Sequence, residues 1–298
     1  MNLVTDAAAG VLRGPLRSLE RRAAAAHGPA AWARDAAFVQ RHLPTVETVL
    51  RYFAPEVRHV ERLPATGPVL VVGNHSGVFY MPDMWATAAA VVRRRGVDSP
   101  VFGLGYDLLF TLPGVESVLR RFGALPASGH AAEGALADGA ALLVYPGGDW
   151  EACRPWTHRN RVDFHERTGF VRLALRAGVP VLPVAAHGGH HSVVVISRGD
   201  RIARALGLDR LHIHVMPVVA GVPFGVAPVV LPPVPLPTKV TVDFLEPLDW
   251  SADGPDAAGD PAIVRARYDE ITAILQSGLD DLRAERPHPV LSRLGLGP

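Results

Sequence analysis

A histidine and an aspartate stand close to the chain's clearest candidate for a buried strand. Residues 69–72 are apolar and mostly β-branched, which is typical of such a strand, and a glycine–asparagine pair ends it. His75 follows at once. Pro82 and Asp83 come next where a helix should begin, because proline and carboxylates favour the first turn of a helix. The two side chains are therefore predicted to lie at opposite ends of one short loop.

This arrangement would suit proton transfer. A neutral histidine held by a carboxylate is a general base with a suitable pKa near neutral pH. The alternative is structural: His75 would satisfy the backbone of the turn, and Asp83 would only cap the helix. Short motifs also occur by chance, so these residues alone leave both interpretations open.

A second loop that could bind a ligand follows the apolar run 141–145. It lies at the carboxyl end of a predicted strand, where open α/β sheets bind ligands. Gly147 and Gly148 would let backbone amides approach a ligand closely, while Glu151 and Arg154 add one charge of each sign. The arginine could hold a phosphate; alternatively, the stretch is a simple turn with a surface ion pair. Nearby arginines that could help are Arg159, Arg161 and Arg167.

Other motifs point to no further chemistry. The chain has neither a Gly-x-Ser-x-Gly nucleophile elbow nor a phosphate-binding P-loop. The sequence His-Gly-Gly-His-His at 187–191 has no carboxylate nearby, so we interpret it as a glycine-rich loop near the active face, with metal binding the less favoured alternative. Cys153 is the single cysteine, which excludes an intramolecular disulfide, and its sequence context suggests no activated nucleophile.

The elements that would position these loops follow an α/β pattern. Short apolar runs alternate with helical patterns, which predicts a single domain with a mostly parallel central sheet flanked by helices. Predicted helices cover about 82–95, 129–138 and 168–177, with a final helix from 261. Predicted strands cover about 57–63, 69–73, 100–105, 140–145 and 179–185, with a late strand at 238–244 that is a candidate for the edge of the sheet.

Helices are also expected to precede this domain. One helix is predicted over residues 5–26, and a second begins near Ala30 and is interrupted by Pro44. The second is expected to pack on the domain; whether the first packs or lies on a bilayer stays open. We divide the chain into an N-terminal helical segment, 1–56, and an α/β domain, 57–290.

The composition limits the partners of this chain of 298 residues. Net charge is +1, which gives no strong case for a nucleic-acid partner. The N-terminus lacks the order of a secretory signal peptide, and the sequence has no run of 18 uncharged apolar residues. We therefore expect a cytoplasmic location, with any relation to a membrane being peripheral.

Four blocks of sequence, in order, resemble the glycerolipid and lysophospholipid acyltransferase superfamily, closest to its diacylglycerol-acyltransferase-like branch. Three features depart from the family pattern, one of them Val78 in place of the second glycine of the branch's His-Ser-Gly-Gly motif. Seven residues separate His75 from Asp83 where the commonest pattern has four, and the third block reads Gly-Gly-Asp-Trp-Glu rather than Glu-Gly-Thr-Arg. The four blocks lie within residues 69–190 and are Asn74–Gly77 with Asp83, Phe110–Ser128, Tyr145–Gly148 with Glu151, and Arg167–Val184.

The resemblance implies transfer of a fatty acyl chain from acyl-CoA, as co-substrate, to a hydroxyl of a lipid acceptor, without a cofactor or metal. His75 would remove the hydroxyl proton, and Asp83 would hold the imidazole tautomer. The implied location is peripheral, on the inner face of the membrane. The implied substrate-binding residues are Asn74, Ser76, Gly77, Gly147, Gly148, Glu151, Arg154 and Arg167.

Two other functions stay open besides acyl transfer to a lipid. An acyl-CoA thioesterase or esterase would use His75 to activate water and would need no acceptor lipid. A non-catalytic lipid-binding protein would bind acyl ligands without turnover. The apolar, proline-rich stretch 216–237 would either admit acyl chains from a membrane or simply cover the sheet, since exposure cannot be read from sequence.

Overall fold

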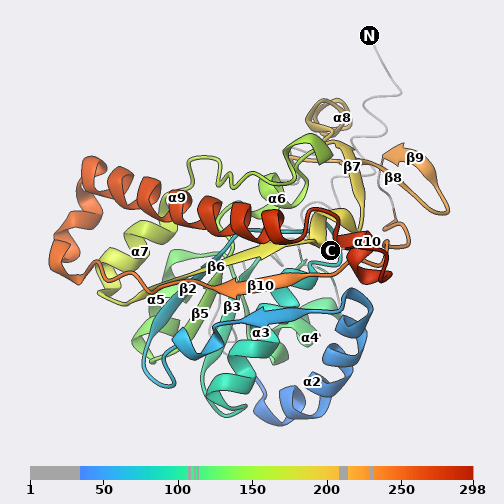
Figure 1. Cartoon of the computed structure of the whole chain (residues 1–298). Helices are drawn as coiled ribbons and strands as arrows, with labels where there is room; N and C mark the ends of the chain where they lie inside the picture. The colour runs from blue at the N-terminus through green and yellow to red at the C-terminus, as the bar shows by residue number, and fades with distance from the viewer. Residues whose placement is uncertain are drawn as a thin grey trace, which may run out of the picture.

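The computed structural model describes residues 34–106, 109–110, 112, 114–207, 214–228 and 231–297, and a seven-stranded sheet forms its centre (Figure 1). The strands are ordered β1-β10-β6-β2-β5-β3-β4. Neighbours from β6 to β4 are parallel, whereas β10 pairs antiparallel with β6 and parallel with β1. The predicted α/β fold with a mostly parallel sheet is confirmed. The strands are β1 Glu56–Arg58, β2 Val69–Gly73, β3 Val101–Gly105, β4 Ala124–Pro126, β5 Ala141–Val144, β6 Val181–His187 and β10 Thr241–Phe244.

Helices bury both faces of the central strands. In β2, Leu70 and Val72 face one core, formed with α5, α7 and α9, while Val69 and Val71 face the opposite core with α2 and α3. Alternate side chains of a strand point to opposite faces, so a strand covered on both sides must be apolar throughout. The helices are α2 Ala36–Leu50, α3 Pro82–Arg95, α4 Val115–Phe122, α5 Gly129–Ala137, α6 Gly148–Ala152, α7 Gly169–Ala177, α8 Asp200–Ala205, α9 Pro261–Glu285 and α10 Pro289–Arg293.

A smaller antiparallel sheet, absent from the sequence prediction, lies beside the carboxyl ends of the main strands (Figure 1). Its strands are β7 Val194–Ser197, β8 Val218–Gly221 and β9 Gly225–Pro228. Val195 and Val219 pack against Val78, in the loop after β2, and against Cys153, at the end of α6. The small sheet therefore supports the two loops that were predicted to carry the chemistry.

Most predicted elements are confirmed, but three predictions are wrong. Helix α2 is not interrupted at Pro44, because its buried stripe against α3 outweighs the hydrogen bond that a proline removes. The strand expected over 57–63 is shorter, since the 3₁₀ turn Val60–Arg62 follows β1. Strand β10 is not at the edge, because β1 pairs outside it. The helix predicted over 5–26 lies outside the described residues.

The described helices differ in length and polarity, and none of them combines the length and apolar character that crossing a membrane requires. The longest is α9, with 25 residues, which carries a buried stripe and a charged outer side. Its apolar residues cover the sheet, as the sequence pattern predicted.

Candidate active site

The structure brings His75 and Asp83 together at the carboxyl edge of the sheet. Strand β2 leads into His75, and the first turn of α3 carries Asp83. Asp83 is fully buried, and His75 is 6% exposed. The distance from His75 Nδ1 to Asp83 Oδ2 is 3.7 Å, and neither His75 Nδ1 nor Asp83 Oδ1 has a hydrogen-bond partner among the described residues. Catalytic hydrogen bonds are often this long before substrate binds, so a small rotation of the imidazole would form one.

The loop between these two residues folds back tightly despite its extra length. Phe79 (φ 63°) and Met81 (φ 43°) adopt left-handed backbone conformations. Such conformations cost a non-glycine residue ~1–3 kcal/mol and persist where the surrounding structure enforces them. The amide of Tyr80 donates to the carbonyl of Val78 at 2.7 Å. The turn returns the chain to α3, where Asp83 Oδ2 also accepts from the Ser76 amide at 2.8 Å.

Asn74 and Ser76 fix the same loop to β6 and to the segment that follows it. The Asn74 amide donates to the Ala186 carbonyl at 3.0 Å and accepts from the Ala186 amide at 2.8 Å. Ser76 Oγ accepts from the Gly189 amide at 2.9 Å. A Cβ at position 189 would lie 1.4 Å from the Ser76 carbonyl oxygen, so only glycine fits there. A Cβ on Gly77 would lie 3.4 Å from the Gly189 backbone and 3.3 Å from Pro82 Cδ, so this position is closely packed as well.

A buried ion pair holds the backbone of His75 from the second loop. Arg154 Nη1 lies 2.8 Å from Glu151 Oε1, and the two side chains are 3% and 0% exposed. Glu151 Oε2 accepts from the His75 amide at 2.9 Å, and Arg154 Nη2 donates to the His75 carbonyl at 2.7 Å. Burial raises the pKa of Glu151 and lowers that of Arg154, while their mutual attraction opposes both shifts. The pair therefore sets the position of His75.

Arg167 and the two glycines shape this second loop. Arg167 donates to the Gly147 carbonyl at 2.9 Å and to Asp149 Oδ1 at 2.8 Å. A Cβ on Gly148 would lie 2.7 Å from the Arg167 guanidinium, and one on Gly147 would lie 2.4 Å from Glu151 Cβ. The glycines thus make room for side chains of this protein, and Arg167 fixes the loop that carries Glu151.

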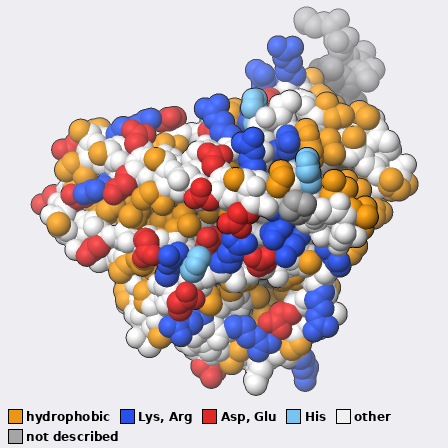
Figure 2. Space-filling model, in the orientation of Figure 1, with side chains coloured by type: hydrophobic (Ala, Val, Ile, Leu, Met, Phe, Trp, Pro, Cys, Tyr) orange, Lys and Arg blue, Asp and Glu red, His pale blue; other side chains and the backbone are white. Residues whose placement is uncertain are grey.

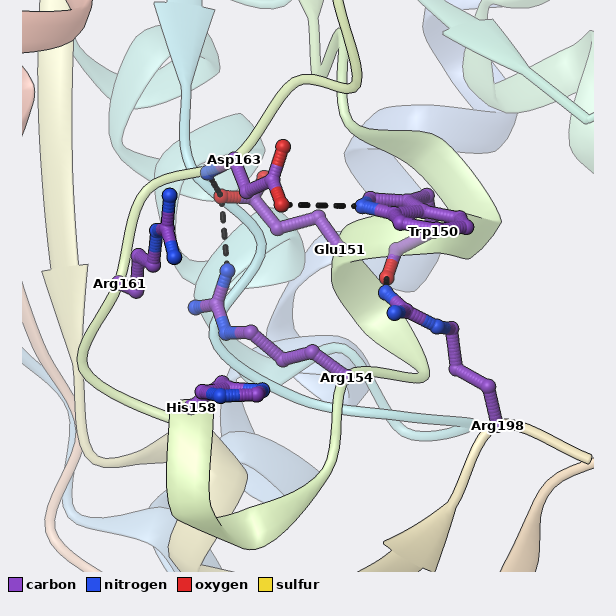
Figure 3. A pocket seen from close by; sticks show the side chains of 7 residues that line it. All are labelled: Trp150, Glu151, Arg154, His158, Arg161, Asp163 and Arg198. Atoms are coloured by element: carbon purple, nitrogen blue, oxygen red, sulfur yellow. Dashed lines mark hydrogen bonds and ion pairs between the residues drawn. The ribbon is translucent and has the colours of Figure 1, made fainter.

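A pocket of about 180 Å³ opens beside the ion pair (Figure 3). Its acidic side chains have partners: Glu151 pairs with Arg154, and Asp163 accepts from the Trp150 indole at 3.1 Å. The guanidinium of Arg198 lies 3.4 Å from the centre of the Trp150 ring. Three guanidinium groups against two carboxylates give the pocket a net positive charge, suited to a phosphate. The lining residues are Trp150, Glu151, Arg154, His158, Arg161, Asp163 and Arg198.

Two residues outside the predicted catalytic and substrate-binding residues also surround His75. The Tyr145 ring stacks on the imidazole, with centroids 4.6 Å apart and planes at 22°. His190 is 4% exposed and lies beside the His75 backbone, and burial lowers its pKa well below the usual value. The placement of His190 supports the interpretation of 187–191 as a loop near the active face. Within the described ranges, no three His, Cys, Asp or Glu side chains are placed to hold a metal ion.

The histidines after β6 predict a loss of stability in acid. Burial lowers the pKa of His187 to about 4 and that of His191 to about 3, against ~6.5 in an unfolded chain. Because the unfolded chain takes up these protons first, the free energy of unfolding is highest above pH ~6.5 and falls as the pH decreases, by up to ~1.4 kcal/mol per pH unit for each histidine. Urea unfolding between about pH 7 and pH 5 measures this slope.

Two variants test whether the buried histidines cause this pH dependence of the free energy of unfolding. His191→Gln should make the dependence on pH weaker, while His130→Gln, at an exposed position, should leave it unchanged. Equal slopes in the native protein and His191→Gln would contradict the prediction.

Comparisons with known proteins agree with this geometry. The family model Acyltransferase matches residues 54–187. An uncharacterized protein of Mycobacterium tuberculosis is 30% identical over 235 residues, 79% of this chain and 63% of that protein. The human DGAT1/2-independent enzyme synthesizing storage lipids is 26% identical over 190 residues, 64% of this chain and 56% of that protein. The chain thus spans less than two thirds of these relatives.

A solved structure shares the fold. The 1-acyl-sn-glycerophosphate (LPA) acyltransferase PlsC from Thermotoga maritima aligns with a TM-score of 0.52 at 17% identity, over 83% of this chain and 80% of that chain. The family match includes the sheet edge that carries His75, Asp83 and the Glu151–Arg154 pair. The match over residues 54–187 and the human relative support a relation of this chain to the glycerolipid acyltransferase superfamily.

Proposed function

We propose that this protein transfers a fatty acyl chain from acyl-CoA to a hydroxyl of a lipid acceptor, with His75 as general base and Asp83 as its orienting carboxylate. The supporting observation is the buried His75–Asp83 pair at the carboxyl edge of the sheet. A carboxylate facing Nδ1 favours the tautomer that carries the proton there. Nε2 is then the nitrogen that accepts a proton.

The reaction follows from this tautomer. His75 Nε2 removes the acceptor's hydroxyl proton as the oxygen attacks the thioester carbonyl. The carbon–sulfur bond then breaks, and the thiolate of CoA takes the proton back from the imidazolium. Asp83 stabilises the imidazolium while it exists, as the acid does in hydrolase triads. The Glu151–Arg154 pair keeps the His75 backbone in place throughout.

We place the phosphate of one substrate in the cationic pocket. Arg161→Ala and Arg198→Ala should each raise one KM by ~10-fold or more with a smaller effect on kcat, since a hydrogen bond to a charged group contributes ~1.5–3 kcal/mol. Initial rates measured against donor and acceptor concentration show which KM rises and hence which substrate carries the phosphate. Arg41→Ala, an exposed arginine on α2, is the control. Unchanged values for both substrates would exclude this placement.

A lipid acceptor also implies a membrane as partner. The enzyme would then act as a peripheral protein on the inner, cytoplasmic face of the membrane, where donor and acceptor meet. The exposed apolar side chains beside the active edge support a peripheral contact with a membrane.

Release of CoA thiol from a long-chain acyl-CoA, with and without a total lipid extract, tests the proposed activity. A transferase should release thiol in proportion to added lipid and form a new acylated lipid. Release at the same rate without lipid would identify a thioesterase instead. Acyl-CoA binding without any release, unchanged in His75→Ala, would favour a non-catalytic lipid-binding protein.

A further inference from the structure

The small sheet carries apolar side chains on both of its faces. Val195 and Val219 are buried against the loop that follows β2, as expected for an inner face. Ile196 and Val226 are nevertheless 48% and 66% exposed. The outer face of an antiparallel sheet normally carries polar side chains, so apolar ones on that side need another explanation. Exposed apolar patches typically mark an interaction site.

The exposed apolar surface extends from this sheet to its neighbours and is here named the apolar face. Figure 2 shows apolar atoms gathered over the small sheet. The Tyr52 hydroxyl donates to the Pro235 carbonyl, and Arg293 donates to the Tyr52 carbonyl, so these segments are continuous. The apolar face consists of Tyr52, Ile196, Val222, Phe224, Val226, Leu231, Val234, Leu236, Leu291, Leu294 and Leu296, all more than 40% exposed.

The charged side chains beside the apolar face are mainly basic. The segment 198–205, which includes α8, carries Arg198, Arg201 and Arg204 against the single acid Asp200. Arg201 and Arg204 are exposed. Apolar side chains bordered by arginines are the combination that binds an anionic membrane surface, where each basic side chain contributes and the apolar ones insert.

The apolar face is joined to the catalytic loop. Val78 packs within the same cluster as Val195 and Val219, and the Tyr80 hydroxyl donates to the Pro233 carbonyl at 2.7 Å. Both Val78 and Tyr80 lie between His75 and Asp83. A bilayer that contacts this face would therefore lie next to the loop that positions the general base.

We infer that the apolar face docks this protein on an anionic lipid bilayer. The inference rests on the proposed function, because an enzyme with lipid substrates must collect them from such a surface. The β8–β9 hairpin, with Val222 and Phe224 in its turn and Val226 in β9, inserts among the lipids, and Arg201 and Arg204 contact the anionic headgroups. The described parts of the stretch 216–237, residues 216–228 and 231–237, for which the sequence left two roles open, thus serve as the membrane contact.

Co-sedimentation of the full chain with vesicles tests this inference. Vesicles of phosphatidylglycerol with phosphatidylcholine should bind the native protein more tightly than vesicles of phosphatidylcholine alone. The double substitution Phe224→Glu with Val226→Glu should weaken binding at least ~10-fold, because it removes apolar burial and adds like charge. Arg201→Glu with Arg204→Glu should abolish the preference for the anionic vesicles. Val49→Glu, at a 64% exposed site on α2, is the matched control.

Parallel activity measurements separate this inference from the proposed function. The Phe224→Glu/Val226→Glu protein should retain turnover of a water-soluble short-chain acyl-CoA and acceptor, and lose it on vesicle-borne acceptor. If the double substitution leaves vesicle binding unchanged, the inference that the apolar face docks on the bilayer is wrong, whatever the activity of the variant. The native protein could instead bind no vesicles and self-associate, with the double substitution abolishing that self-association. This result would assign the apolar face to a second copy of this chain, and it would also overturn the inference. Normal docking by a protein without turnover rejects only the proposed function.

Discussion

His75→Ala should lower the rate of acyl transfer by at least ~10²-fold and up to ~10⁴-fold, the usual contribution of a positioned general base. The loss should lower kcat and leave KM little changed, because His75 removes the proton in the transition state and not when the substrate binds. The substitution should leave the fold intact, since the backbone of His75 makes the contacts to Glu151 and Arg154. Thiol release from acyl-CoA in the presence of acceptor lipid gives the rate.

The control for this prediction is His130→Ala, which removes an exposed histidine from α5. It should retain the native rate. Asp83→Asn should also lower kcat, because an amide favours the wrong imidazole tautomer while it can still accept from the Ser76 amide. A His75→Ala protein with near-native turnover would remove His75 from the mechanism.

Glu151→Ala should lower the free energy of unfolding by ~3–5 kcal/mol, since it leaves the Arg154 guanidinium buried without its carboxylate partner. It also removes the acceptor for the His75 amide. Urea unfolding at neutral pH measures the change. Glu133→Ala provides the matched control, because Glu133 pairs with Arg176 at the exposed surface, where ion pairs contribute little.

The double variant Glu151→Leu/Arg154→Met separates stability from positioning. Replacing both charges by apolar groups should recover much of the lost stability. It should not recover kcat, because both hydrogen bonds to the His75 backbone are gone. Recovery of stability and kcat together would show that the pair has only a structural role.

The strand–loop–helix unit from β2 to α3 could be predicted because its signals are local. Four apolar residues, a glycine–asparagine pair and a proline at the first turn mark its parts, and the structure has α3 at Pro82–Arg95 as expected. The small sheet could not be predicted in the same way. Its pairing joins Val194–Ser197 to Val218–Gly221 across 20 intervening residues, and proline-rich sequence gives weak strand signals.

The candidate site was predictable in its members but not in their arrangement. The histidine and the acid were found from their position after a strand, whereas the left-handed turn at Phe79 and Met81 that brings them together has no sequence signal. Glu151 and Arg154 were predicted as substrate-binding residues. Their spacing of three residues within a helical turn permits an ion pair, but only the packed structure shows that both also bind the backbone of His75.

The most direct test of the central claim is the fate of an isotopically labelled acyl chain supplied as acyl-CoA with a total lipid extract. Mass spectrometry of the extracted lipids should find the label in a new ester of a lipid hydroxyl with the native protein, and should find almost none with His75→Ala. Equal labelling by both proteins, or label recovered only as free fatty acid, would contradict His75-dependent transfer to a lipid acceptor.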